Sequence, residues 1–181
     1  DTLEKILGLS PNITTKGFGG NTNLRNIIHV HGQLGESIII GVDHPAQMKN
    51  EAFRNNEDIK DIMIKIESNE SMKETRHIDC ERLIANAEVI ILFGVSLGET
   101  DARWWKLIGQ HLKRRRNLAI IQHLYNPGAV NPTQRQKIRQ LERKQQEYLL
   151  QRMEVKMEIG DVDIRNRLFF TVNEPIFKIL P

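Results

Sequence analysis

The feature that most constrains the fold is an apolar run in the middle of the chain. Residues 88–93 read Glu-Val-Ile-Ile-Leu-Phe, and no polar residue follows the glutamate. A run without polar alternation is typical of a strand that is buried on both faces of a parallel sheet. We therefore expect Val89 to Phe93 to form the central strand of an α/β sheet.

The residues after this run predict a βαβ unit. Gly94-Val95-Ser96-Leu97-Gly98 indicates a tight turn, and from about Asp101 apolar residues recur at helical spacing as far as the cations at 113–116. Residues 118–121, Leu-Ala-Ile-Ile, form a second short apolar run. A strand, a helix and a strand in this order predict parallel pairing through a right-handed crossover.

The remaining elements are predicted from the same periodicities. Two β-branched runs, 26–30 and 37–41, predict neighbouring strands. Residues 46–86 predict helices, residues 132–158 predict one long charged helix, and residues 167–172 predict a last strand. Together these elements favour an α/β fold with a parallel, Rossmann-like sheet.

Length and composition favour one domain over residues 1–181. That length suits one domain of ~100–200 residues, and a hydrophobic fraction of 39% is enough for a core. The one cysteine, Cys80, excludes an internal disulfide and a four-cysteine zinc site, which favours the reducing cytoplasm. No apolar run approaches the ~18 residues of a membrane helix. We therefore expect a cytoplasmic protein with no membrane partner.

Positive charge is concentrated in one part of the chain. Residues 103–152 hold twelve Lys or Arg against two Glu, so this segment carries +10 and the rest −7 of a total of +3. Such a segment is expected to attract nucleic acid, a nucleotide or the acidic part of the same fold. Trp104, Trp105, Tyr125 and Tyr148 lie among the cations, so an RNA- or DNA-binding module is one hypothesis for the function.

The turn at 94–98 has the G-x-S-x-G pattern of a hydrolase nucleophile elbow. Such enzymes place an acid and then a histidine after the serine. The last histidine here is His123, and Asp101, the acid that keeps this order, lies in the turn that carries the serine. We therefore expect that Ser96 is not a covalent nucleophile.

Histidines near the ends of the two β-branched runs suggest a metal site as another alternative. His29 and His31 lie on one face of the first run, and Asp43-His44 follows the second. The H-x-H-x-D-H, H-E-x-x-H and C-x-x-C patterns are absent. We therefore predict no metal ligands.

Three short motifs, taken together, resemble the bacteriophage abortive-infection family AbiH. They are His31-Gly32, Gly41-Val42-Asp43 and the block from Gly94 to Asp101, which match H-G, G-[IV]-D and G-x-S-L-G-x-x-D in that family. The resemblance covers most of the chain and implies a role in phage defence. The family's N-terminal G-N-G-F-D segment and N-Y-T triplet are absent and the chain starts at Asp1, so we expect an N-terminally truncated fragment.

The same arrangement is similar, more distantly, to sirtuins and to sirtuin-like NAD hydrolases of defence systems. This resemblance implies a sirtuin-like three-layer fold in which His31 is the acid/base at the nicotinamide ribose. It implies further that Gly32, Gly94, Ser96 and Asp101 line the nucleotide, with NAD as substrate or ligand. The full-length parent is then expected to bind NAD and the fragment to be inactive or nearly so. The sequence leaves open whether the protein forms a homo-oligomer.

Overall fold

The computed structural model describes residues 15–16, 23–24, 27–32, 35, 37–125, 135–157 and 162–173. The chain divides into two units, residues 1–29 with 175–181 and residues 30–174. In the first unit, strands β1 (Thr15–Lys16) and β2 (Asn23–Leu24) pair antiparallel. That residues 1–181 form a single domain stays a prediction.

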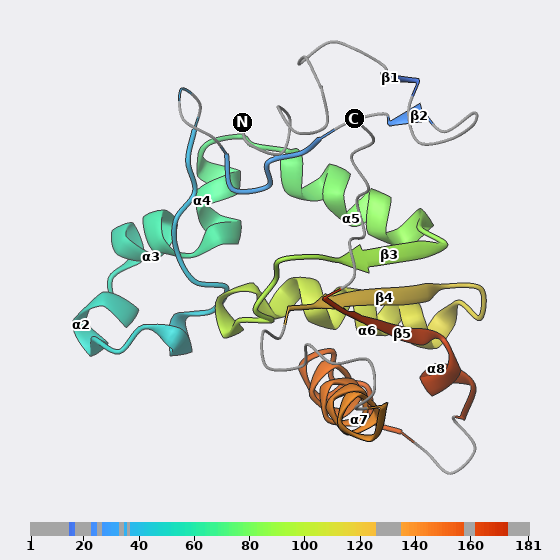
Figure 1. Ribbon diagram of the computed structural model, residues 1–181. Coiled ribbons are helices and arrows are strands. Elements are labelled where there is room, and N and C mark those ends of the chain that lie inside the picture. Colours follow the sequence, from blue (N-terminus) through green and yellow to red (C-terminus); the bar gives the residue numbers. More distant parts are fainter. Residues whose placement is uncertain are drawn as a thin grey trace. The chain divides into compact units, whose positions relative to one another are not determined.

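A three-stranded parallel sheet lies in the second unit (Figure 1). Its strands, in spatial order, are β3 (Val89–Leu92), β4 (Ala119–Leu124) and β5 (Leu168–Val172). The register aligns Ile90 with Ile120, and Ile120 with Leu168. The sheet confirms the α/β class, the parallel βαβ pairing and the last strand, whereas the Rossmann-like, sirtuin-like three-layer arrangement stays a prediction.

The prediction that Val89 to Phe93 is the central strand is wrong for the described sheet, because β4 lies between β3 and β5. Val89 and Ile91 are about half exposed, whereas Ile120 on β4 is fully buried. The apolar run of β3 buries one face only. Continuous apolar sequence therefore does not distinguish an edge strand from a central one here.

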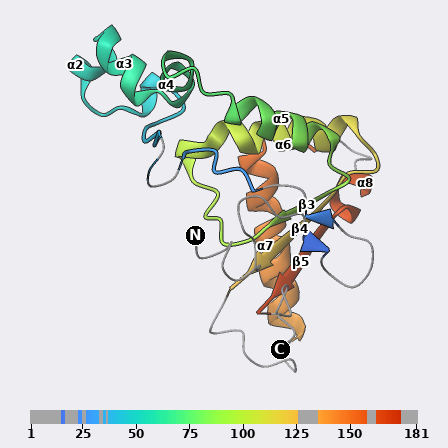
Figure 2. The ribbon, with the colours of Figure 1, turned by 90° about the horizontal axis from the view of Figure 1, so that it is seen from above.

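Helices α6 (Ala102–Arg114) and α7 (Arg135–Arg152) pack against the sheet (Figures 1 and 2). The core they share with the strands consists of Leu92, Leu97, Trp105, Ile108, Leu112, Leu118, Ile120, Leu149, Leu150, Met153, Val155, Ile164 and Leu168. α7 confirms the predicted charged helix but ends earlier, and Glu154 just beyond it has φ +53°. α8 (Val162–Asn166) precedes β5.

The backbones of α6 and the residues after α7 approach closely at Gly109. A Cβ at this position would lie 2.3 Å from the carbonyl oxygen of Met153. Gly109→Ala is therefore expected to lower the free energy of unfolding by about 1–3 kcal/mol, despite the better helix propensity of alanine. The measurement is urea denaturation, with the exposed neighbour Gln110→Ala as control. A Gly109→Ala protein as stable as the control would contradict this packing.

Several short helices occupy the predicted helical region 46–86, which confirms that prediction. Their bounds are η1 (Pro45–Gln47), α2 (Glu51–Arg54), α3 (Glu57–Met63), α4 (Lys65–Ser71) and α5 (Arg76–Asn86). Asn50 and Asn56 cap α2 and α3 through side-chain oxygens that accept backbone N–H groups. In the described ranges, no helix has the length and apolar character to cross a membrane.

The two β-branched runs are not neighbouring strands, so that prediction is wrong. Residues 27–32 and 37–41 form loop and turn, joined by a hydrogen bond from the Ile39 N–H to the His31 carbonyl (2.9 Å). Gly41 instead lies against the junction of α3 and α4, where a Cβ would be 2.1 Å from the Met63 carbonyl oxygen. The second run therefore docks on helices and does not pair with the first.

Candidate functional site

A pocket of about 430 Å³ lies between the loop at residue 31, helix α5 and the turn that follows β3. Its lining residues are Val30, His31, Cys80, Ile84, Gly94, Val95, Ser96, Gly98, Asp101, Trp104 and Trp105. Four of the five predicted site residues therefore meet in one pocket. The fifth, Gly32, is not among the lining residues; it has φ +81°, and a Cβ there would lie 1.9 Å from the Ser37 carbonyl oxygen.

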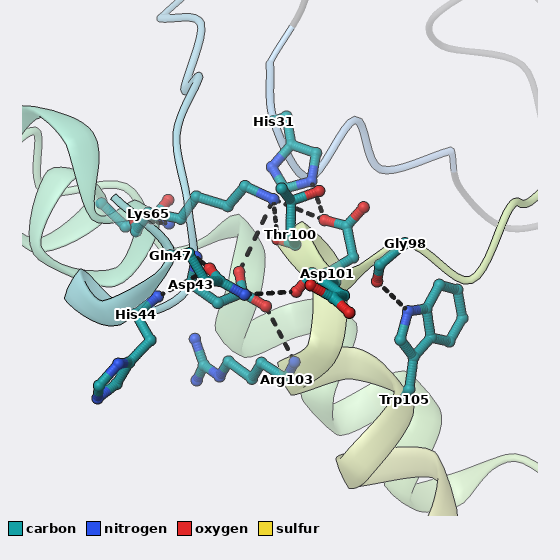
Figure 3. A network of polar contacts seen from close by, with 12 residues as sticks. His31, Asp43, His44, Gln47, Lys65, Gly98, Thr100, Asp101, Arg103 and Trp105 are labelled. Carbon is teal, nitrogen blue, oxygen red and sulfur yellow. Dashed lines mark hydrogen bonds and ion pairs between the residues drawn. The ribbon is translucent and has the colours of Figure 1, made fainter. Parts of the chain in front are cut away.

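The turn between β3 and η2 (Glu99–Asp101) has an unusual backbone. Gly94 and Leu97 adopt φ values of +66° and +53°. Glycine reaches this left-handed region readily, but a leucine there is strained, and Leu97 is held by nearly complete burial. The indole N–H of Trp105 donates to the Gly98 carbonyl at 3.0 Å and fixes the end of the turn (Figure 3). Strained backbone of this kind clusters at functional sites.

His31 and Asp101 face each other at the pocket. Nε2 of His31 lies 3.4 Å from Oδ1 of Asp101, and both side chains are partly exposed (Figure 3). The carboxylate favours the tautomer with its proton on Nε2, and Nδ1 is buried without a hydrogen-bond partner in the part of the chain that the structure describes. A partly exposed imidazole that is paired with a carboxylate can act as a general acid or base.

Lys65, at the start of α4, is the site residue that the sequence analysis missed. Its Nζ lies 2.6 Å from Oδ1 of Asp101, 2.5 Å from the Thr100 carbonyl oxygen and 3.7 Å from Oδ1 of Asp43 (Figure 3). The residue is 9% exposed. A buried ammonium needs such acceptors, and it holds the Asp101 carboxylate in place opposite His31. In sequence, Lys65 is indistinguishable from a solvated lysine on a helix.

Hydrogen bonds of Val42 and Asp43 hold the Gly41-Val42-Asp43 motif near the pocket. Its Oδ2 accepts the backbone N–H of Arg103 in the first turn of α6 at 2.9 Å. The Val42 N–H donates to the Met63 carbonyl at 2.9 Å, and the Lys65 N–H donates to the Val42 carbonyl at 3.0 Å. These bonds place Asp43 beside Lys65 and join the motif to the helix that follows Asp101.

The geometry of the site bears on two alternatives, a metal site at the histidines and a nucleophilic Ser96. Among the described residues, no group of three or more His, Cys, Asp or Glu side chains is arranged to hold a metal ion. Nδ1 of His44 accepts the Ala46 N–H at 3.1 Å and caps η1. The Ser96 side chain is exposed, and the pocket histidine pairs with Asp101. That Ser96 is not a nucleophile stays a prediction.

Cys80 provides a chemical probe of the pocket, because it is the one cysteine of the sequence. Burial, followed by the charges of Asp79 and Glu81, raises the pKa of its thiol. The thiolate is the reactive form, so alkylation by iodoacetamide at pH 8 is expected to be slower in the folded chain than in urea, and to accelerate at higher pH. Mass spectrometry measures both rates; equal rates at pH 8 would contradict the raised pKa.

The same pKa shift has a consequence for stability. A thiol whose pKa is raised by folding stays protonated where the unfolded chain has already released its proton. Its contribution to stability is therefore complete below the pKa of the unfolded thiol and is lost as the pH rises through the folded value. The raised pKa of Cys80 therefore lowers the free energy of unfolding at alkaline pH.

The family model for bacteriophage abortive infection AbiH matches residues 1–123, which is more than half of the chain. The chain belongs to the AbiH family. This confirms the family predicted from the three short motifs, and it assigns the chain to a family of phage abortive infection. The AbiH match contains every residue of the pocket, whereas α7 and β5 lie beyond it. No curated protein and no solved structure matches the chain.

Proposed function

We propose that this AbiH protein acts in phage defence by binding NAD in the pocket and hydrolysing its N-glycosidic bond. The observation that carries the proposal is the His31–Asp101 pair, 3.4 Å apart, at a pocket that also contains the strained Gly94–Gly98 turn. The distant similarity of the H-G and G-x-S-L motifs to NAD hydrolases supports this choice of substrate.

In this proposal His31 is the acid/base. Its imidazole accepts a proton from a ribose hydroxyl or from the attacking water, while the Asp101 carboxylate stabilises the imidazolium that forms. The contacts of Asp101 with Lys65 and His31 all use Oδ1, so Oδ2 accepts a hydrogen bond from a sugar hydroxyl. Ser96 and Gly94 line the nucleotide.

The lining suits the nucleoside end of NAD. The indole of Trp104 offers surface for a flat base, and the volume of about 430 Å³ lies within the range of small-molecule pockets. The lining residues include an acid but no Lys or Arg. The nicotinamide ribose therefore occupies the pocket, and the pyrophosphate lies at its mouth.

The proposal is tested by measuring the binding of NAD to the protein, which does not depend on turnover. NAD and nicotinamide riboside are titrated calorimetrically into the full-length protein, and both are expected to bind and to slow alkylation of Cys80, which lines the pocket. ADP-ribose without the base is expected to protect Cys80 less. If neither NAD nor the riboside binds or protects the thiol, the proposed function is wrong.

A further inference from the structure

Five exposed cations on α7 have no hydrogen-bond or ion-pair partner in the part of the chain that the structure describes. They are Arg135, Lys137, Arg139, Arg143 and Lys144. Arg152 at the end of the same helix differs, because it pairs with Glu99 and stacks over the Tyr148 ring. Since no described side chain forms an ion pair with any of the five, their charge is available to an external anion.

Three of these cations form a stripe along the helix. Arg135, Arg139 and Arg143 follow one another at intervals of four residues, which places successive side chains about 6 Å apart along the helix axis. A regular row of cations fits a polymer with regularly spaced negative charges, such as a phosphate backbone, better than it fits one small anion.

A groove of about 340 Å³ lies beside this stripe, between α7 and the edge strand β5, which run close together in Figures 1 and 2. It is lined by Glu142, Arg143, Gln146, Leu168, Phe169 and Phe170. Phe169 is 51% exposed. An exposed aromatic ring beside phosphate-binding cations is the combination that proteins use for single-stranded nucleic acids, whose bases stack on the ring.

We propose that the α7 stripe and this groove bind single-stranded nucleic acid. Arg135, Arg139 and Arg143 contact successive phosphates, and one base stacks on Phe169. Binding to an anionic membrane is disfavoured, because Leu149 and Leu150 of α7 are buried in the core and, among the described residues of α7 and the groove, Phe169 is the one exposed large apolar side chain. The surface lies outside the residues matched by the AbiH model and is distinct from the proposed NAD pocket.

The test is fluorescence anisotropy of the complete protein with labelled oligo(U) and oligo(dT) single strands of about 12 nucleotides. The variant Arg135→Gln/Arg139→Gln/Arg143→Gln keeps helix propensity nearly constant. It is expected to bind about 100-fold more weakly at about 0.1 M salt, and its plot of log K against log salt is expected to be shallower by about 2.

Phe169→Leu separates stacking from charge. Leucine preserves an apolar side chain but offers no aromatic face, so affinity is expected to fall about fivefold or more with the salt slope unchanged. Unchanged affinity in Phe169→Leu would overturn the assignment of a stacked single strand.

A matched control variant tests whether the loss of affinity is specific to the cations of α7. Lys49→Gln/Lys73→Gln/Lys156→Gln removes the same charge from exposed positions outside α7 and is expected to bind as the wild type does. Failure of the wild type to bind either strand, an equal loss in this control, or tighter binding to phosphatidylserine vesicles than to oligo(U) would each overturn the proposal.

Discussion

Lys65→Met is expected to lower the free energy of unfolding by about 3–5 kcal/mol. The substitution leaves the buried carboxylate of Asp43 and the carboxylate of Asp101 close to each other without the ammonium group that now separates them. The Asp101 side chain also loses its shortest contact, at 2.6 Å, so its orientation toward His31 is no longer fixed. Urea denaturation measures the stability.

Lys60→Met is the matched control for this substitution. Lys60 pairs with Glu57 three residues earlier on α3, and the glutamate side chain is 81% exposed, so the control is expected to cost less than about 1 kcal/mol. The double variant Lys65→Met/Asp43→Asn, which removes one of the stranded charges, is expected to regain part of the loss. Equal stability of Lys65→Met and Lys60→Met would show that the Lys65 network does not hold the site together.

His31→Ala is expected to reduce NAD hydrolysis by the full-length protein by about 100- to 10,000-fold, because general acid–base catalysis contributes that much. The fold should be largely retained. The His31 side chain is 38% exposed and its removal leaves little cavity. Turnover is measured as nicotinamide release, and stability as the midpoint of urea denaturation.

His111→Gln controls for the loss of an imidazole. His111 lies on α6 but does not line the pocket, and glutamine maintains the helix. This variant is expected to hydrolyse NAD at the wild-type rate. If His31→Ala hydrolyses NAD within about threefold of the control, His31 is not the acid/base.

The parts of the fold that sequence patterns predicted are those with strong local signals. Residues 89–92, 102–114 and 119–124 were predictable as a βαβ unit because both strands contain short apolar runs, the helix has apolar residues at helical spacing, and the turn after the first strand contains glycines. The predicted strands at 26–30 and 37–41 have β-branched composition, but the described residues of these runs have no partner strand in the part of the chain that the structure describes. Backbone bonds to the α3–α4 junction hold the second run instead.

The sequence motifs pointed to His31 and Asp101, but they did not reveal Lys65, which holds Asp101 in place. His31 and Asp101 were recognisable because H-G and G-x-S-L-G-x-x-D are short motifs of one family. Lys65 has no such motif, and its role follows only from the contact that folding creates with Asp101. The α7–β5 groove likewise depends on tertiary packing, although the concentration of charge in residues 103–152 led to the expectation that this segment attracts nucleic acid, a nucleotide or the acidic part of the same fold.

The most direct test of the proposed function is nicotinamide release from NAD by purified full-length protein, measured with and without a lysate of phage-infected cells. We expect release of nicotinamide and ADP-ribose in equal amounts, at least in the presence of the lysate, by the wild type and by His111→Gln but not by His31→Ala. Absence of NAD loss under both conditions, with no calorimetric binding of NAD, would contradict the assignment of the His31–Asp101 pocket to NAD hydrolysis.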